Sequence, residues 1–389
     1  MKTIRVLHVV NNLACGGIET WLRNLVLQHD GRFQNDFAVL QETSRKSYEK
    51  EIRSSGSKVL GPLMPPTRSK LLARLLLKNE FARILRTDMY DVVHVHAYNL
   101  SGNLLRAASD LGVPVRIVHS HNQSPASKGL AAAFRHLCAA RDRKRVLRYA
   151  TDIAACSQGA GRSFIGESVW NNDPRCSVVY CGIDLDEFRQ AANRLSSGVN
   201  LRQQYGIPED AVVIGHVGSM KKQKNQEFFL DICRALSRRS EKYYFFLAGE
   251  GTLYDEVRKH ACALGIQNRV VMPGLCKTPE IMCGLFDVFL FPSLFEGLGI
   301  VILEAAASGL FTVCSDMIPK DLTESSLKDR IRCVSLTEPE QVWADCVEES
   351  VRKKISPAAG MEILEKSCFT VGSSLDQLYG LYSRRLGLG

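Results

Sequence analysis

Short apolar runs, rich in β-branched and aromatic side chains, alternate with longer stretches of helical character along the whole chain. This alternation is typical of parallel sheets whose two faces are covered by helices, so the predicted fold class is α/β. The runs that predict strands are residues 4–10, 36–40, 58–60, 91–96, 115–119, 152–156 and 177–180 in the first half, and 212–217, 243–248, 269–272, 287–291, 311–314 and 331–334 in the second.

A polar, helix-prone stretch separates the two groups of strands. It covers residues 186–208 and ends in Gly-Ile-Pro, which predicts a hinge. At 389 residues the chain is long for one core and sufficient for two. We therefore expect a first domain over residues 1–190, a second over 191–368 and a terminal helix over 369–389.

One stretch of the second half combines a strand end, a glycine loop, a helix start and two carboxylates. Gly297 and Gly299 let a ligand approach the backbone, and the free N–H groups of the helix start favour an anion such as a phosphate. Glu296 and Glu304 are spaced so that both can face one side and accept hydrogen bonds from sugar hydroxyls. The pattern predicts a sugar-nucleotide site; the alternative is a tight turn before a solvated helix.

The sequence from Pro292 to Gly309 resembles the Glu-x7-Glu signature of the retaining glycosyltransferases of family 4 almost without a gap. The resemblance implies the GT-B fold, in which two Rossmann-like, doubly wound domains face each other across a cleft and a C-terminal helix crosses back to the first. It also implies that Glu304 binds the nucleotide ribose and that Glu296 contacts the transferred sugar. The amides implied to meet the sugar and the diphosphate are those of Gly297, Leu298, Gly299 and Ile300.

Two loops of the first half resemble the family at single positions. Gly16 and Gly17 match its first glycine loop, which approaches the donor phosphate or the acceptor. His121 falls where the family has a histidine that faces the donor sugar. Cys181 replaces the family's asparagine after the last strand of this half, which weakens the case for a polar contact there. The alternatives are an ordinary strand–helix turn and a hydrogen-bonded histidine at a strand end.

The second half continues the resemblance with one departure. Gly218 and Gly249 close two strands as the family's glycines do, and Lys224 matches its lysine. Ser219, however, stands where the family has an arginine. Without a metal, the protein must supply a cation for the leaving diphosphate, so Lys224 becomes the main candidate. The alternative is a solvated lysine loop.

Two histidine pairs end strands of the first half, His94 with His96 and His119 with His121. Alternate residues of a strand point to the same face, so a zinc site has to be considered. No third ligand with convincing spacing is present, and the resembled enzymes need no metal for catalysis. We therefore expect neither a metal nor a cofactor, with the nucleotide sugar as substrate.

Composition places the chain among ordinary globular proteins, with 45% apolar and 23% charged residues. Its 13 cysteines are scattered singly, which favours buried thiols in a reducing compartment over disulfides or a zinc site. The N-terminus has no signal-like apolar run, and no stretch approaches the ~20 apolar residues of a membrane span. We expect a cytoplasmic location.

The net charge of +9 is concentrated in two segments. Residues 68–86 hold six Lys/Arg and one Glu, and residues 135–148 hold six Lys/Arg and one Asp, so the two carry +5 each and +10 together. The first segment predicts a basic amphipathic helix able to lie on anionic lipid at the inner membrane face; the alternative is a surface helix packed on its own core. Neither segment has interleaved aromatic residues, so a nucleic-acid partner is not expected.

The predicted activity is the transfer of a hexose from a nucleotide diphosphate sugar, expected to be UDP-linked, to a growing glycan. Residues 155–157 and 315–320 are similar to exopolysaccharide and capsule enzymes of the family, which implies a lipid-diphosphate-linked acceptor. Two alternatives stay open. One is a non-hydrolysing sugar-nucleotide epimerase on the same fold, and the other is a non-catalytic protein that binds sugar nucleotides.

Overall fold

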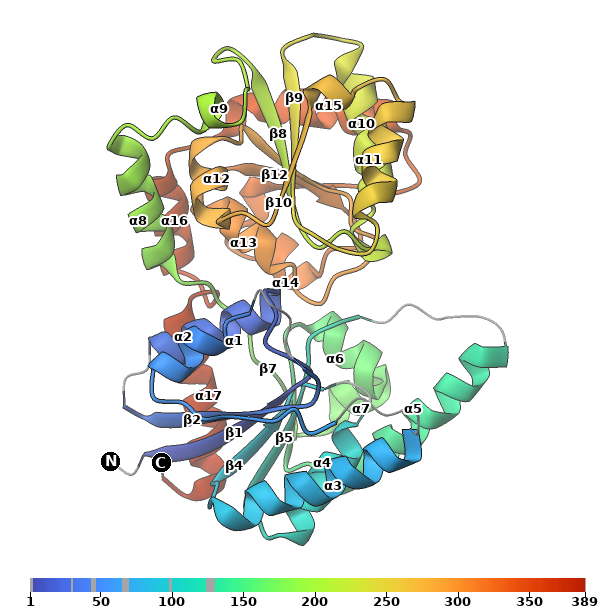
Figure 1. Cartoon of the computed structure of the whole chain (residues 1–389), viewed down its shortest axis with the longest axis vertical. Helices are drawn as coiled ribbons and strands as arrows, with labels where there is room; N and C mark the ends of the chain where they lie inside the picture. Colours follow the sequence, from blue (N-terminus) through green and yellow to red (C-terminus); the bar gives the residue numbers. More distant parts are fainter. Residues whose placement is uncertain are drawn as a thin grey trace. The chain divides into compact units, whose positions relative to one another are not determined.

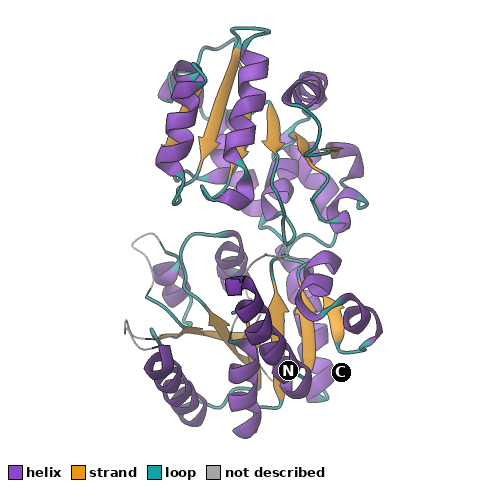
Figure 2. Ribbon diagram, turned by 90° about the vertical axis from the view of Figure 1, so that its right-hand side faces the viewer, coloured by secondary structure: helices purple, strands orange, loops and turns teal. Residues whose placement is uncertain are grey.

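The computed structural model describes residues 3–28, 31–42, 47–64, 70–97, 100–123 and 130–388. The chain divides into two compact units. The first unit comprises residues 1–181 and 371–389, and the second comprises residues 182–370. Each unit is built on one parallel sheet with helices on both faces (Figure 1, Figure 2), as the alternation of apolar and helical stretches predicts.

The first unit contains a seven-stranded sheet in the order β3-β2-β1-β4-β5-β6-β7. Neighbouring strands pair in parallel throughout. The strands are β1 (Ile4–Val10), β2 (Phe33–Val39), β3 (Val59–Leu60), β4 (Val92–Val95), β5 (Val115–Ser120), β6 (Asp152–Ala155) and β7 (Cys176–Val178). Most of their residues are buried, as expected for strands covered on both faces.

Eight described helices cover this sheet. They are α1 (Gly17–Leu27), α2 (Glu49–Ser54), α3 (Lys70–Thr87), α4 (Ser101–Asp110), α5 (Leu130–Tyr149), α6 (Gln158–Ile165), α7 (Glu167–Asn172) and α17 (Val371–Leu386). The two basic helices, α3 and α5, both pack against α4.

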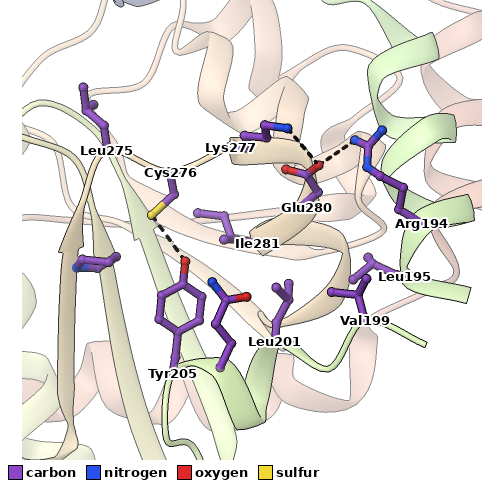
Figure 3. A pocket seen from close by; sticks show the side chains of 12 residues that line it. Arg194, Leu195, Val199, Leu201, Tyr205, Leu275, Cys276, Lys277, Glu280 and Ile281 are labelled. Carbon is purple, nitrogen blue, oxygen red and sulfur yellow. Dashed lines mark hydrogen bonds and ion pairs between the residues drawn. The ribbon is translucent and has the colours of Figure 1, made fainter. Parts of the chain in front are cut away.

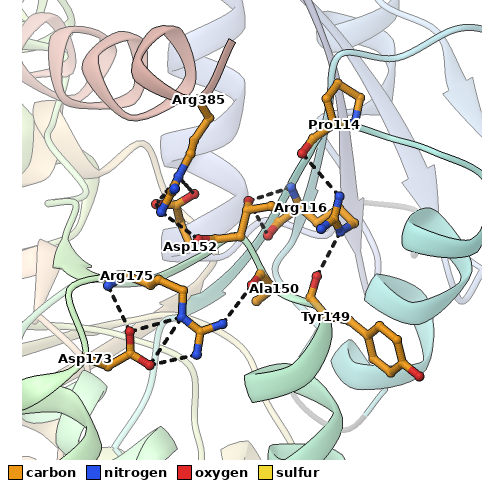
Figure 4. A network of polar contacts seen from close by, with 9 residues as sticks. Pro114, Arg116, Tyr149, Ala150, Asp152, Asp173, Arg175 and Arg385 are labelled. Carbon is orange, nitrogen blue, oxygen red and sulfur yellow. Dashed lines mark hydrogen bonds and ion pairs between the residues drawn. The ribbon is translucent and has the colours of Figure 1, made fainter. Parts of the chain in front are cut away.

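The C-terminal helix α17 is held to the first unit by polar contacts to β4 and to β6. The Tyr382 hydroxyl lies 2.6 Å from Nδ1 of His94, inside the unit. One turn further along the helix, Nε of Arg385 donates to a carboxylate oxygen of Asp152, the first residue of β6, at 2.9 Å (Figure 4). Asp152 is only 2% exposed, so losing Arg385 would leave a buried carboxylate without its ion pair.

The second unit contains a six-stranded parallel sheet in the order β10-β9-β8-β11-β12-β13. Its strands are β8 (Val212–Val217), β9 (Tyr243–Ala248), β10 (Val270–Gly274), β11 (Val288–Phe291), β12 (Phe311–Ser315) and β13 (Ile331–Val334). Its helices are α8 (Leu185–Ser196), α9 (Leu201–Gln204), α10 (Gln226–Ser237), α11 (Tyr254–Ala263), α12 (Thr278–Gly284), α13 (Ile300–Ala307), α14 (Lys320–Thr323), α15 (Glu340–Ser350) and α16 (Pro357–Glu365). β8, β11 and β12 lie in the middle of the sheet, so loops after these strands share one edge.

The boundary between the units lies earlier than the sequence suggested. The expected boundary followed residue 190, with a hinge in residues 186–208, but α8 and α9 occupy that stretch and belong to the second unit. Helix α8 packs on α12 and α16 and buries Phe188, which explains why it stays with the second unit. The first of the two stretches that make up the first unit therefore ends at Cys181.

The two segments that connect the units pair with each other. Ile183 forms a parallel bridge with Thr370, and its N–H donates to the carbonyl of Phe369 at 2.9 Å. A Cβ atom on Gly182 would lie 2.1 Å from the Thr370 carbonyl oxygen, so the close approach requires glycine. The outgoing and returning segments consequently lie side by side.

All 13 cysteines are free thiols. The prediction that they are buried is wrong for five of them, which are exposed: Cys15, Cys138, Cys262, Cys333 and Cys368. In the described part of the chain, no helix has both the length and the apolar character needed to span a bilayer.

Candidate active site

The glycine loop between β11 and α13 forms where the sequence predicts it. Helix α13 begins at Ile300 directly after Gly299, whose φ of +89° lies in the left-handed region that favours glycine. Gly297 and Leu298, which precede it, are buried. The first N–H groups of a helix have no partner within the helix, so this turn presents donors to a ligand. The helix ends at Ala307.

A second loop, from the next strand of the sheet, is bonded to this one. The backbone N–H of Leu294 donates to the carbonyl of Gln223 at 2.8 Å, and the Gln223 side chain donates to the carbonyl of Phe295 at 2.9 Å. Asn225, which has a positive φ of 55°, donates from its side chain to the carbonyl of Pro292 at 3.1 Å. These bonds fix the lysine loop against the glycine loop.

Lys224 and Glu296, one from each loop, form an ion pair. Nζ of Lys224 lies 2.7 Å from Oε1 of Glu296, and the two side chains are 16% and 6% exposed. The ammonium also lies 4.8 Å from the centroid of the Phe291 ring, which is a cation–π contact. Both charges are largely withdrawn from water, so a phosphate that binds Lys224 has to compete with Glu296.

Glu304 lies on α13 and is half-buried. Burial raises the pKa of its carboxyl group to about 8; the negative charge of Glu187 raises it further, and the positive charge of Lys224 opposes the change. No ion pair of Glu304 is found among the described residues. A carboxyl group that is mostly protonated at neutral pH, beside a cation and a helix start, is a candidate for ligand binding.

Gly218, Ser219 and Gly249 lie just beyond the carboxyl ends of β8 and β9. A Cβ atom on Gly249, whose φ is +140°, would lie 2.0 Å from the carbonyl oxygen of Gly218, so these two loops touch through their backbones. The Ser219 carbonyl accepts a hydrogen bond from the Gln226 side chain at 3.0 Å. Its hydroxyl supplies no positive charge, and the role expected for Lys224 stays a prediction.

The remaining predicted residues belong to the first unit. Gly16 is the N-cap of α1 and Gly17 is its first residue, so this loop presents a helix N-terminus. His121 follows β5 and is buried, with Nε2 2.8 Å from Nδ1 of His96 and Nδ1 3.6 Å from Sγ of Cys181. The structure thus brings Lys224 and Glu296 together within the second unit, while Gly16, Gly17 and His121 are part of the first.

Five of the nine histidines gather in the first unit: His8, His94, His96, His119 and His121. Each is at most 9% exposed. Burial is the main cause that lowers the pKa of every one of them, to about 4 for His8 and about 3 for His121. All five imidazoles are therefore neutral at physiological pH.

The sheet supplies the third histidine that sequence spacing did not reveal. His8 with His94 and His96, and His96 with His119 and His121, each bring three ligand atoms within 4.8 Å of one another. Imidazole suits several transition metals, so such a set is a possible metal site by donor chemistry alone.

A cavity of about 490 Å³ lies elsewhere in the second unit, between α8, α9 and the segment from β10 to α12 (Figure 3). Glu280 at its rim pairs with Arg194 at 2.6 Å and with Lys277 at 3.8 Å. Tyr205 and Cys276 approach each other across it, at 3.9 Å from hydroxyl to sulfur. None of the residues predicted for the site lines this cavity.

Sequence reasoning missed several side chains that shape the site. His8 could have been found, because a doubly wound sheet places β1 beside β4, and His8 is the register partner of His94. Gln223, Phe291 and Glu187 act through contacts between separate loops and helices, for which the sequence carries no spacing signal.

Two family models match the chain. The model described as Glycosyltransferase Family 4 matches residues 15–187, and the model described as Glycosyl transferases group 1 matches residues 199–320. A Bacillus subtilis protein named "Putative glycosyltransferase EpsF" is 32% identical over 351 residues, which cover 88% of this chain and 86% of that protein. The sheets and the loops described above are thus those of a glycosyltransferase. The chain belongs to glycosyltransferase family 4.

More distant proteins agree on the fold. An Escherichia coli relative, named UDP-Gal:alpha-D-GlcNAc-diphosphoundecaprenol alpha-1,3-galactosyltransferase, is 25% identical over 60% of each chain. The structure of Anabaena HepE in complex with UDP and glucose aligns with a TM-score of 0.75 at 19% identity, covering 98% of this chain and 99% of that one. Sucrose-phosphate synthase from Thermosynechococcus elongatus aligns with a TM-score of 0.74 at 16% identity, covering 99% and 100%. The predicted GT-B fold is confirmed.

Proposed function

We propose that this protein is a retaining glycosyltransferase that moves a hexose from a UDP-linked donor to a lipid-linked glycan of the exopolysaccharide or capsule type. The donor is supported by HepE, whose structures contain UDP with glucose and UDP-glucose. The acceptor is supported by the name of the E. coli relative, a galactosyltransferase for a diphosphoundecaprenol-linked sugar. Retention of configuration is carried over from the family resemblance.

The observation that carries the proposal is the contact of Lys224 with Glu296 beside the start of α13. When the bond to the sugar breaks, the leaving nucleoside diphosphate gains negative charge, which a cation and oriented amides stabilise. Lys224 supplies the cation and the N–H groups of α13 supply the amides. Glu296, once Lys224 has turned to the phosphate, accepts a hydrogen bond from the sugar, and Glu304 accepts from the ribose.

The other site residues complete this assignment. His121 contacts the transferred sugar, as the family resemblance implies, and Gly16 and Gly17 approach the donor phosphate or the acceptor. Lys221 and Lys222, both exposed, are the reserve cations if Lys224 does not reach the diphosphate. No cofactor or metal takes part in this scheme.

Purified protein incubated with a panel of sugar nucleotides, with and without lipid-diphosphate sugars, tests the proposal. We expect a product that requires both partners and whose new linkage keeps the donor's anomeric configuration by NMR. Release of a free epimer without acceptor would indicate the epimerase alternative instead. Binding of the sugar nucleotide without turnover would indicate a non-catalytic protein.

Peripheral contact with the cytoplasmic face of an anionic membrane is the second part of the proposal. The exposed basic residues of the described segments are Lys78, Arg83 and Arg86 in α3 and Arg141, Lys144, Arg145 and Arg148 in α5. Phe81, Ile84 and Leu85 of α3 are buried in the unit, so lipid would be met by charge and not by insertion of these apolar residues. Each basic group near an anionic surface contributes about 1 kcal/mol, which salt weakens.

Vesicle sedimentation measures this contact. We expect binding to vesicles that contain anionic lipid, less binding at high salt, and little binding to neutral vesicles. Equal binding to both kinds of vesicle would contradict an electrostatic contact.

A further inference from the structure

A chain of hydrogen bonds runs through three buried imidazoles of the first unit. Nε2 of His8 lies 3.1 Å from Oδ1 of Asn35, and Nδ1 of His8 lies 3.0 Å from Nε2 of His96. Nδ1 of His96 lies 2.8 Å from Nε2 of His121, whose Nδ1 lies 3.6 Å from Sγ of Cys181. The chain thus leads from an amide on β2 to a thiol at the end of the unit.

Neutral imidazoles impose an order on such a chain. Each carries one N–H donor and one acceptor nitrogen, so the tautomer of one ring fixes the tautomer of the next. His8, His96 and His121 must therefore all be Nε2–H or all be Nδ1–H. The Asn35 carbonyl oxygen facing His8 selects the first arrangement, in which His8 donates to Asn35, His96 donates to His8 and His121 donates to His96.

The distances favour shared protons over a metal ion. Nitrogen ligands around a tetrahedral zinc ion, at about 2.0–2.1 Å from the metal, lie about 3.3 Å apart. The two contacts within the chain, at 2.8 and 3.0 Å, are shorter than this and have the length of ordinary hydrogen bonds. Zinc binding is the alternative that the experiment below also tests.

We propose that His8 and His96 are positioning residues that hold His121 as the Nε2–H tautomer. Nδ1 of His121 is then the acceptor nitrogen, and its only partner in the described part of the chain is the weak contact from the Cys181 thiol. A sugar hydroxyl is a stronger donor than a thiol and can replace it there. This inference rests on the proposed function, in which His121 contacts the transferred sugar.

Two substitutions of His96 separate positioning from packing. The Asn side chain places an amide where imidazole has Nδ1, so His96→Asn keeps an acceptor for His121. The Gln side chain places its amide where imidazole has Nε2, so His96→Gln keeps a partner for His8 but withdraws the acceptor from His121. The two variants remove the same ring and differ in which neighbour loses its partner.

His119→Phe is the matched control. His119, like His96, is buried, at 2% and 9% exposed, and its ring centroid lies 4.0 Å from that of His121. Its nitrogens make no bond to the chain of imidazoles and, apart from a weak approach to the backbone of Val179, have no partner among the described residues. Phenylalanine keeps an aromatic ring at this position but has no ring nitrogen, so this variant changes a buried ring beside His121 without changing the hydrogen bonds of the chain.

The experiment combines ring-nitrogen NMR of histidine-labelled full chain with transfer kinetics. We expect His121 to be Nε2–H in the parent, in His96→Asn and in His119→Phe, and to lose this preference in His96→Gln. kcat should fall by about tenfold in His96→Gln, the equivalent of one hydrogen bond, with a smaller change in the donor KM, and stay within a few-fold in the other two variants.

Several results would overturn the proposal. They are an unchanged His121 tautomer in His96→Gln, a changed tautomer with unchanged kcat, and an equal loss of kcat in His119→Phe. Stoichiometric binding of added ZnCl₂ that shifts the resonances of these rings would identify them as metal ligands instead. The tautomer measurement needs no substrate, so its failure is distinguishable from failure of the proposed transferase activity.

Discussion

The first unit buries five imidazoles that remain uncharged, whereas the second buries a lysine against a glutamate and keeps a second glutamate nearby. In the first unit the polar groups are held by hydrogen bonds among neutral rings. In the second, opposite charges compensate each other at 2.7 Å. Both arrangements lie at the carboxyl ends of parallel strands. The difference predicts that acid lowers the stability of the first unit, whereas a negatively charged ligand binds to the charged groups of the second.

We expect the largest effect from acid, which should lower the stability of the first unit. The folded pKa values of the buried histidines lie below the ordinary 6.5, so only the unfolded chain takes up protons as the pH falls below that value. Their stability contribution is complete above pH 6.5 and is lost between about 6.5 and 4. For each pH unit below 6.5, a buried histidine that stays neutral lowers the free energy of unfolding by about 1.4 kcal/mol, so two such histidines lower it by about 3 kcal/mol per pH unit. Hydrogen exchange should show earlier opening of residues 1–181 than of 182–370.

His119→Phe sharpens this test. It removes one buried group that must stay neutral, so unfolding takes up one proton fewer and the free energy of unfolding falls less steeply as the pH decreases. Equal opening of both units between pH 7 and 5 would show that the cluster does not govern the response to acid.

Lys224→Ala should come next, because it removes the cation and leaves Glu296 as a buried, uncompensated charge. A charge-assisted hydrogen bond is worth roughly 1.5–3 kcal/mol, so kcat/KM should fall about ten- to a hundredfold. Initial-rate kinetics with the sugar nucleotide measure this. Lys221→Ala, at an exposed neighbour, is the control and should stay near the parent. Loss of activity in Lys221→Ala, with normal activity in Lys224→Ala, would show that Lys221 and not Lys224 supplies the cation.

Glu304→Ala should mainly raise the donor KM, by about tenfold, because a ribose contact is made equally in the ground and transition states. In the parent, the donor KM should also fall as the pH rises through about 8, where the carboxylate forms and gains acceptor strength. Glu187→Gln keeps Glu304 but removes a charge that raises its pKa, so the same change should occur at lower pH. A donor KM that is flat with pH in the parent would exclude Glu304 from ribose binding.

Ser219→Arg should give the smallest effect, and in the opposite direction. An arginine at this position restores the family's residue beside Lys224 and should tighten donor binding by a few-fold, as expected for one added cation that is partly exposed to solvent. Titration calorimetry with UDP measures this, and Ser219→Gln serves as the uncharged control of similar length. An equal gain in both variants would attribute the effect to size instead of charge.

Some strands could be read from the sequence residue by residue, whereas β2 begins at Phe33, three residues before its predicted start. β1, β8 and β9 begin and end where predicted, because each is rich in β-branched or aromatic residues and is followed directly by asparagine or glycine. The glycine loop and α13 were also predictable, since Gly299 and Gly309 mark both ends of the helix locally. These features depend on neighbours in the sequence.

The parts that could not be read depend on contacts between distant residues. The spacing of the lysine loop gave no sign that Gln223 and Asn225 bond it to the glycine loop. The hinge was misplaced because α8 has a polar composition, and only its packing on α12 and α16 assigns it to the second unit. The third histidine gives no signal within a single strand, because His8 meets His94 only through the pairing of β1 with β4.

The paired connections at Gly182 and Thr370 have a consequence for synthesis. The second unit is one continuous segment, residues 182–370, set within a first unit that begins and ends the chain. On the ribosome the second unit can complete its sheet while the first still lacks α17, which supplies Tyr382 for His94. The first unit, although begun first, therefore receives α17, and with it the partner of His94, only after residues 182–370 have been made.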